Sequence, residues 1–147
     1  MSIQQNLTEA MKVAMKAKDS LRLNAIRMAR TALKNAEIEA RGELDDDATI
    51  RVLSTLVKQR REAADAYRAT RPELADKEEQ ELAVLQEFLP AQLTEAELVS
   101  MVEQAIAESG ASSPRDMGAV MKQLTPKTTG RADGKLVSQL VRSKLGG

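Results

Sequence analysis

The sequence predicts an all-α protein of two parts, on three observations. Apolar residues recur at three- and four-residue spacing along almost the whole chain, which is the period of an amphipathic helix. The composition favours helices, since 42% of residues are hydrophobic and 30% charged, with 1% aromatic and seven glycines among 147 residues. Proline, glycine and capping residues divide this pattern into segments. We therefore expect an N-terminal domain of about four helices over residues 1–89 and a small three-helix domain over residues 90–147.

The first two predicted helices lie before residue 42. The apolar face of the first holds Ile3, Leu7, Met11, Ala14 and Met15. The second begins near Ser20, its expected N-cap, and its apolar residues are Leu23, Ile26, Ala29, Leu33 and Ala36. Gly42 is the expected C′ residue, because glycine readily adopts the left-handed conformation that ends helices.

The third and fourth predicted helices follow the acidic stretch GELDDDAT. Asp47 is the expected N-cap of the third helix. Pro72 suits the first turn of the fourth, where its missing N–H is not needed. This helix should end just before Pro90, because the residue before a proline disfavours helical angles. The apolar residues are Ile50, Leu53, Leu56, Val57, Ala64 and Tyr67 in the third helix, and Leu74, Leu82, Leu85 and Leu89 in the fourth.

Three shorter helices are predicted after residue 90. A Thr-x-x-Glu capping box at Thr94 begins the first, and Gly110 ends it. The Ser-Pro pair at Pro114 begins the second, and Pro126 is expected to stop it. The apolar residues of the three are Leu98, Met101, Val102, Ala105 and Ile106, then Met117, Val120, Met121 and Leu124, then Leu136, Val137, Leu140, Val141 and Leu145.

Composition excludes several classes of site. The chain has no cysteine and no histidine. Disulfides, thiolate nucleophiles, the commonest metal ligand and the usual proton shuttle near neutral pH are therefore absent. No apolar run reaches the about 18 residues of a membrane span, and the N-terminus lacks the apolar core of a signal peptide. We expect a cytoplasmic protein with no metal and no cofactor.

The formal net charge is zero, but the charges are unevenly distributed. Residues 12–34 carry seven bases and one acid, and residues 115–147 carry seven bases and two acids. Between these blocks, residues 73–87 carry six acids and one base, and residues 90–114 carry four acids and no base. The zero total conceals two basic blocks, and such blocks suit an anionic partner.

The terminal basic block contains GRADGKL, which shares glycines and a lysine with phosphate-binding loops. A P-loop needs four residues between its glycines, a hydroxyl residue after the lysine and a preceding strand. Here three residues separate Gly130 from Gly134, Leu136 stands at the hydroxyl position, and no strand is predicted. We expect a helix start instead, with Gly130 turning the backbone and Asp133 accepting free N–H groups of the last helix.

The cationic side chains around this helix start are candidates for binding a phosphate backbone, because basic residues and helix N-termini both attract anions. The candidate RNA-binding residues are Lys122, Lys127, Arg131, Lys135, Arg142 and Lys144. Solvated surface charge is the alternative for each, and Asp133 would occupy part of the same anion site. No aromatic residue is near for base stacking, so the expected contacts are to phosphate or sugar.

Other polar groups have simpler explanations. The aspartates at residues 45–47 lack the spacing of a calcium loop and fit an acidic helix start. Glu78, Glu79 and Glu81 lie in a charge run that we expect to be solvated, which does not favour acid–base chemistry. The basic residues within residues 58–71 are expected on a charged outer face. Methionines four residues apart in the first and sixth helices are expected in the core. No catalytic residue is predicted.

Three segments resemble the YqeY-like family of small bacterial proteins. They are LAVLQEFLPAQLTEAEL from residue 82, DMGAVMKQL from residue 116 and GRADGKLVSQLVRSKL from residue 130. Residues 66–82 fit as well, so the resemblance covers essentially the whole chain. It implies a helical N-terminal domain and a three-helix C-terminal domain similar to the tail domain of the B subunit of glutamine-dependent tRNA amidotransferase.

The resemblance implies that the tail helps this enzyme to hold tRNA, while the catalytic chemistry takes place elsewhere in the enzyme. By position, the structural motif of the tail corresponds here to Met117, Gly118, Met121, Gly130, Asp133 and Gly134. Gly118 is expected to permit close helix packing. No amidase or kinase-like domain is attached, so carbon–nitrogen ligase activity with glutamine as amido donor is expected only within a larger complex.

Residues and resemblance together predict a non-catalytic accessory protein that binds tRNA, or a tRNA-bearing complex, through its basic C-terminal helices. A helical protein–protein adaptor without direct RNA contact stays open as an alternative. A contiguous exposed apolar patch would favour the adaptor, and a basic face without such a patch would favour RNA.

Overall fold

The computed structural model describes residues 2–146, and every regular element within them is a helix. Seven α-helices and one short 3-10 helix are present there, so the all-α prediction is confirmed. The chain divides into two compact units, Met1–Pro90 and Ala91–Gly147. That these units are independent domains stays a prediction. No helix in the described part of the chain has the length and apolar character needed to cross a membrane.

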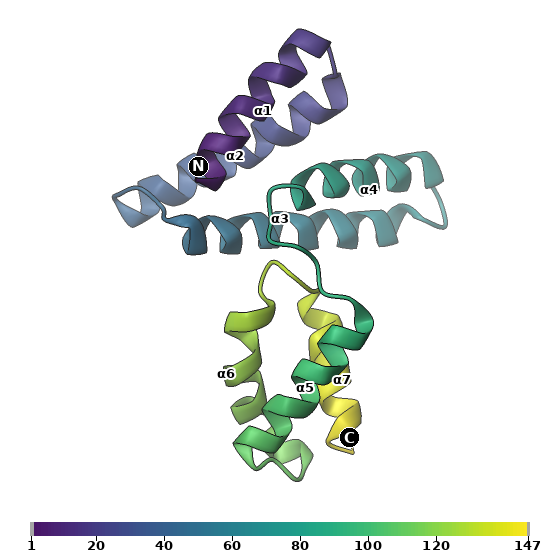
Figure 1. Ribbon diagram of the computed structural model, residues 1–147. Helices are drawn as coiled ribbons and strands as arrows, with labels where there is room; N and C mark the ends of the chain where they lie inside the picture. The colour runs from purple at the N-terminus through teal and green to yellow at the C-terminus, as the bar shows by residue number, and fades with distance from the viewer. Residues whose placement is uncertain (1, 147) are drawn as a thin grey trace. The chain divides into compact units, whose positions relative to one another are not determined.

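The N-terminal unit holds four helices, α1 (Ile3–Ala17), α2 (Ser20–Ala40), α3 (Asp46–Tyr67) and α4 (Pro72–Gln86). Figure 1 shows them as two antiparallel hairpins, α1 with α2 and α3 with α4. The hairpins are joined by contacts of α2 with both α3 and α4, and of α1 with α3.

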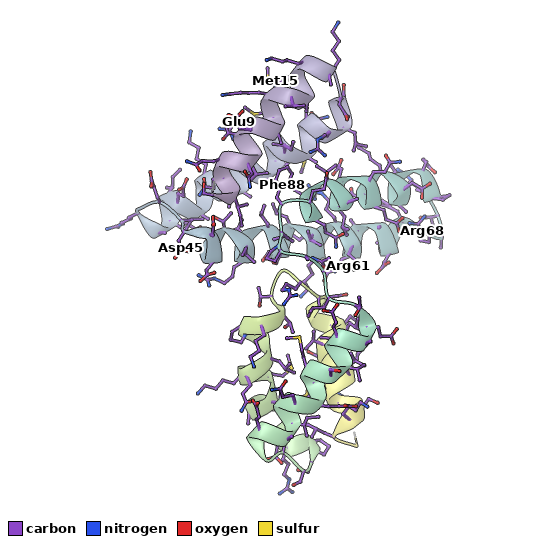
Figure 2. The ribbon with its side chains drawn as sticks, viewed as in Figure 1. Glu9, Met15, Asp45, Arg61, Arg68 and Phe88 are labelled. Carbon is purple, nitrogen blue, oxygen red and sulfur yellow. The ribbon has the colours of Figure 1, made fainter. Side chains whose placement is uncertain are left out.

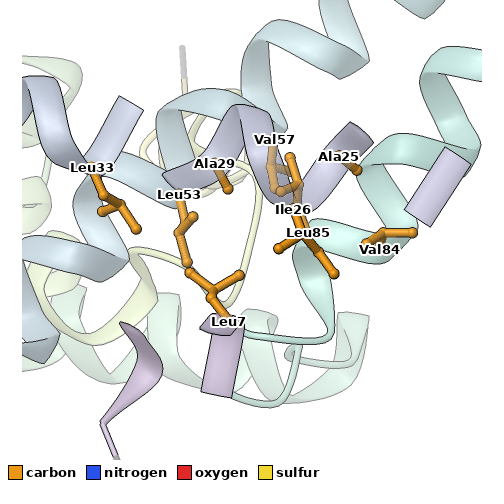
Figure 3. Close-up of a cluster of buried hydrophobic side chains, with 9 residues drawn as sticks. All are labelled: Leu7, Ala25, Ile26, Ala29, Leu33, Leu53, Val57, Val84 and Leu85. Carbon is orange, nitrogen blue, oxygen red and sulfur yellow. The ribbon is translucent and has the colours of Figure 1, made fainter. Parts of the chain in front are cut away.

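One aliphatic core lies between these four helices (Figure 3). Leu7 of α1, Ile26 of α2 and Leu53 of α3 are fully buried, and Leu85 of α4 is nearly so. Burial of such a side chain contributes about 1.5–3 kcal/mol. Each amphipathic helix therefore supplies at least one large aliphatic anchor to a shared cluster.

Two predicted N-caps in this unit are wrong. The carboxylate of Asp19, not the hydroxyl of Ser20, caps α2 by accepting a backbone N–H at 3.1 Å. Asp45, two residues before the predicted Asp47, caps α3 in the same way at 2.8 Å. In both cases an earlier carboxylate reaches a free N–H in the first turn. Ser20 and Asp47, the predicted caps, are then residues of the first helical turn.

The residue that ends α2 in the left-handed conformation is Arg41, not the predicted Gly42. Arg41 has φ of 56°, and the N–H of Gly42 donates to the carbonyl of Glu37 at 3.2 Å. The Arg41 N–H also donates, to the carbonyl of Ile38 at 3.3 Å, and the two bonds form a Schellman motif. These bonds offset the roughly 1–2 kcal/mol that a left-handed non-glycine residue costs.

Helix α4 begins at Pro72 as predicted but ends at Gln86 rather than just before Pro90. The N–H groups of Glu87, Phe88 and Leu89 each donate to a carbonyl three residues back. The chain therefore leaves α4 through a tightened turn. The restriction imposed by the following proline is not what ends this helix.

Arg60 of α3 lies inside the α3–α4 hairpin, and this corrects the charged outer face predicted for residues 58–71. Its Nε is 3.0 Å from Glu81 Oε2 and 3.5 Å from Glu78 Oε2, both on α4. The side chains of Arg60 and Glu81 are 13% and 9% exposed, so the prediction that Glu81 is solvated is wrong. The cause is the packing of α4 against α3, which covers this part of the charged face.

The C-terminal unit holds α5 (Glu95–Ser109), a 3-10 helix (Pro114–Asp116), α6 (Met117–Thr128) and α7 (Gly134–Lys144). Each of the three α-helices contacts the other two. They enclose a second aliphatic cluster of Leu98, Val102, Ala105, Val120, Leu124, Val137, Val141 and Leu145. The three-helix prediction for this part of the chain is confirmed.

Pro126 lies within α6, so the prediction that it stops this helix is wrong. Proline removes one backbone donor, but the helix continues to Thr128. The Thr128 hydroxyl donates to the carbonyl of Leu124 at 3.1 Å, and the N–H of Thr129 donates to that of Thr125 at 3.0 Å. These two bonds hold the last turn of α6 together although Pro126 donates no backbone hydrogen bond.

Three residues assigned to apolar faces are exposed instead, one of them Tyr67 of α3 at 37%. Met15 of α1 is 49% exposed (Figure 2), and Leu136 of α7 is 42% exposed. Met11, Met117 and Met121 are partly buried against the two cores, as expected. A three- and four-residue pattern therefore identifies the helices but overestimates the width of the buried face.

Gly118 lies on an open surface of α6. A Cβ atom at this position would meet no heavy atom within 4 Å, so the expectation of close helix packing there is wrong.

Because alanine favours a helix over glycine by up to about 1 kcal/mol, we expect Gly118→Ala to raise the free energy of unfolding by up to that amount. Urea unfolding measures it. A clear loss of stability would contradict the open surroundings.

Candidate functional site

The six candidate cationic residues lie on the last two helices and the turn between them. Lys122 and Lys127 are on α6, Arg131 is in the turn, and the remaining three are on α7. All are exposed except the half-buried Arg131. The structure therefore leaves five of them accessible to a ligand.

The acidic partners of these residues differ. Lys144 pairs with Glu103 of α5 at 2.9 Å, so its charge is already balanced. Lys122, Lys127, Lys135 and Arg142 form no ion pair with any residue from 2 to 146. An exposed cation without an acidic neighbour loses no ion pair when it meets a phosphate, so these four are the stronger candidates.

The helical period distributes the candidates over more than one face. Lys135 and Arg142 are seven residues apart in α7 and share its exposed side. Lys122 and Lys127 are five residues apart in α6 and point about 140° from each other. The structure thus brings together the pair on α7 and separates the pair on α6, so the six residues do not form one cluster.

Arg131 has a structural role that the sequence did not reveal. Its Nε donates to the carbonyl of Ala91 at 3.1 Å, and its own carbonyl accepts the N–H of Leu93 at 2.8 Å. The side chain of Gln92 donates to the carbonyl of Gly130 at 2.8 Å. These three bonds fasten the turn to residues 91–93. We call this set of bonds the turn clasp.

The turn itself confirms the predicted helix start. Gly130 is buried with φ of 78°, a conformation that favours glycine. The Asp133 carboxylate accepts the N–H of Lys135 at 3.1 Å and caps α7. Gly134 is simply the first residue of that helix. Because Asp133 already occupies the free N–H, GRADGK is a capped helix start.

The positive charge of this turn also acts on a carboxylate at the N-terminus of α5. Thr94 and Glu97 form the predicted capping box, with both hydrogen bonds at 3.1 Å. The backbone and then the side chain of Thr94 lower the pKa of Glu97, and the positive charge of Arg131 lowers it further. A carboxylate whose pKa is lower in the folded state contributes stability that is lost as the pH falls through that pKa. The positive charge of Arg131 therefore interacts partly with the carboxylate of Glu97.

Sequence reasoning missed Gln92 and Ala91 as partners of the turn. No local signal identifies them, because the contacts join residues 38 and 40 positions apart, and each is accepted by a backbone carbonyl. It also missed a hollow between α1 and α2, where Arg27, Arg30 and Lys34 follow each other at helical spacing. That spacing was visible in the sequence.

A protein-family model described as "Yqey-like protein" matches residues 4–145. Similar proteins are named "Altered inheritance of mitochondria protein 41, mitochondrial". The one from Lachancea thermotolerans is 35% identical over 114 residues, 74% of this chain and 60% of the relative. The one from Vanderwaltozyma polyspora is 39% identical over 85 residues, 56% of this chain and 46% of the relative. The one from Pyrenophora tritici-repentis is 29% identical over 141 residues, 92% of this chain and 77% of the relative.

The first two relatives are considerably longer than the matched region, since the chain spans 60% and 46% of their lengths. All three are fungal rather than bacterial, and their names place them in mitochondria. What the whole relatives do therefore does not transfer directly to the matched region.

Proposed function

The chain belongs to the Yqey-like protein family, and from that premise we propose that it is a non-catalytic accessory protein whose C-terminal unit binds the phosphate backbone of tRNA or of a tRNA-bearing complex. The observation that carries the proposal is the set of four exposed cations, Lys122, Lys127, Lys135 and Arg142, without acidic partners among the described residues. The similarity of this unit to the amidotransferase B-subunit tail is part of the same proposal.

The contacts would be to phosphate and not to base edges. The single tyrosine and the single phenylalanine both belong to the N-terminal unit, so no aromatic side chain of residues 91–147 can stack on a base. Lysine and arginine on helices supply point charges for the backbone instead. Affinity should then depend strongly on salt, because each phosphate contact releases a bound counterion.

The proposal predicts a reduced salt dependence when the unpaired cations are removed. We expect Lys127→Ala with Lys135→Ala to weaken tRNA binding and to reduce the slope of log affinity against log salt by about 0.9 per lost duplex contact, or about 0.7 per single-strand contact. Filter binding across a salt series measures both quantities.

Lys144→Ala is the matched control in the same unit, because Glu103 already balances this lysine. The slope of log affinity against log salt for Lys144→Ala should differ from the wild-type slope by less than the slope of the double variant does. Arg131→Ala is unsuitable as a test, since it also breaks the turn clasp. Equal slopes for the wild type and the double variant would exclude Lys127 and Lys135 from the interface.

A protein–protein adaptor is a second candidate, favoured by exposed apolar side chains on the first hairpin. Val13 and Met15 of α1 are 63% and 49% exposed, and Met28 and Ile38 of α2 are 47% and 67% exposed. Exposed apolar residues of this size are typical of binding surfaces when they are contiguous.

The cytoplasmic location expected from the sequence stays a prediction, because the relatives above carry a mitochondrial name.

A further inference from the structure

A groove runs between α1 and α2 on the surface of the N-terminal unit. It encloses about 560 Å³ and is lined by Gln4, Thr8 and Met11 from α1 and by Arg27, Arg30 and Lys34 from α2. It continues toward the N-terminus of α1 into a second hollow of about 680 Å³, which shares Gln4, Lys34 and Glu37 with the first. Both hollows lie within the N-terminal unit, and the second is also lined by residues 42–44 between α2 and α3.

The two walls of the groove differ in charge. The α2 wall presents Arg27, Arg30 and Lys34, spaced three and four residues apart, and therefore along one side of the helix. The α1 wall is neutral. The acid Glu37 also lines the groove, but it accepts the N–H of Leu44 at 3.2 Å and the side-chain amide of Gln4 at 3.5 Å. The groove therefore presents a cationic wall to a ligand.

Apolar side chains that a ligand can reach lie in the groove and one helical turn beyond it. Met11 lines the groove and is partly buried, whereas Leu7 and Leu33 beneath it belong to the buried core (Figure 3) and are 0% and 2% exposed. Met15 follows Met11 by one turn of α1, and Ile38 follows Lys34 by one turn of α2; Met15 and Ile38 are both exposed. Exposed methionine is typical of surfaces that accommodate varied apolar partners.

The dimensions suit a helix. Gln4, Thr8, Met11 and Met15 recur along α1 over eleven residues, which corresponds to about 16 Å or three turns. An amphipathic helix that lies in such a groove uses apolar anchors at i, i+4 and i+7. Its flank beside α2 would need acidic residues to match the cationic wall.

We propose that this groove binds an acidic amphipathic helix of a partner protein. The apolar stripe of that helix packs on Met11, Met15 and Ile38, and its acidic flank pairs with Arg27 and Lys34. An RNA backbone fits less well, because it would leave Met11, Met15 and Ile38 without an apolar contact, and no aromatic side chain is among the residues that line the groove. The proposal concerns the N-terminal unit and does not depend on tRNA binding by the C-terminal unit.

The test uses the full chain and a fluorescein-labelled synthetic peptide of about 18 residues, which is five helical turns. This peptide has leucines at i, i+4, i+7 and i+11 and glutamates at the flanking positions. A second peptide has the same composition with the leucines spread around the helix, and a third has lysine in place of glutamate. Fluorescence anisotropy should show the first peptide binding at least about tenfold more tightly than either control.

Variants of the protein locate the site. Arg27→Glu with Lys34→Glu should weaken binding of the first peptide at least about tenfold. Lys12→Glu with Lys16→Glu is the matched control, because these exposed α1 residues do not line the groove, and it should change binding less than about twofold. If the reversed variant fails to fold by circular dichroism, Arg27→Gln with Lys34→Gln tests the same contacts.

Three results would overturn the proposal. The first is peptide binding that is equal for both leucine arrangements, or that is unaffected when Arg27 and Lys34 are changed. The second is loss of tRNA binding in the groove variant with no peptide binding by the wild type, which would assign the groove to nucleic acid. The third is self-association that requires Arg27 and Lys34, which would assign it to a second copy of the chain.

Discussion

Arg60→Ala should lower the free energy of unfolding of the N-terminal unit by about 3–5 kcal/mol, because it leaves the nearly buried carboxylate of Glu81 without its cation. The carboxylate of Glu78 adjoins the same site and adds like-charge repulsion. Urea unfolding followed by circular dichroism measures the loss.

The exposed pair of Lys58 and Glu62 on the same helix provides the control. These side chains are 65% and 66% exposed and 4.0 Å apart, so Lys58→Ala should cost no more than about 0.5 kcal/mol. A loss for Arg60→Ala as small as that for Lys58→Ala would show that the buried pair does not constrain the hairpin.

The same site permits a test in the opposite direction. Arg60 Nε and Glu78 Oε2 make no aligned hydrogen bond, although the charges are close. A buried ion pair with incomplete hydrogen bonding does not fully offset its desolvation. Removing all three charges, as in Arg60→Met with Glu78→Gln and Glu81→Leu, should therefore be near neutral, or stabilising by about 1–4 kcal/mol, in contrast to the single change.

Leucine-to-alanine changes in the two cores should destabilise by about 2–5 kcal/mol each, because Leu53 and Leu124 are 0% and 1% exposed. If the two units fold independently, each change affects one transition. Tyr67 is the only tyrosine and belongs to the N-terminal unit, so its fluorescence reports that unit, whereas circular dichroism reports both.

Leu53→Ala should then lower the midpoint of the Tyr67 transition. Leu124→Ala should leave that midpoint unchanged and lower the midpoint of the remaining dichroism change. An equal shift of the Tyr67 transition in both variants would mean that the chain unfolds as one cooperative body.

Features that depend on neighbours along the chain were predictable from the sequence. The capping box of Thr94 and Glu97, the cap at Asp133 and the left-handed Gly110 all involve residues within five positions of one another. The misplaced caps at Ser20 and Asp47 arose where two capping residues lie close together in the sequence, because local preference does not decide between them.

Features that depend on packing between helices were not predictable. The burial of Arg60 required knowledge of where α4 lies against α3. The same holds for Arg131, whose side chain appears in the sequence as a free cation but is held by the carbonyl of Ala91. The sequence identified the basic residues of the C-terminal unit, whereas the structure distinguishes those with partners from Lys122, Lys127, Lys135 and Arg142.

The most direct test of the proposed function is the binding of the full chain to bacterial or mitochondrial tRNA and to duplex DNA of similar length across a salt series. The proposal predicts binding to tRNA near physiological salt that is tighter than the micromolar range of nonspecific association, and clearly tighter than binding to the duplex. Equal and weak binding to both, lost at moderate salt, would reduce the basic C-terminal helices to nonspecific charge and contradict the account.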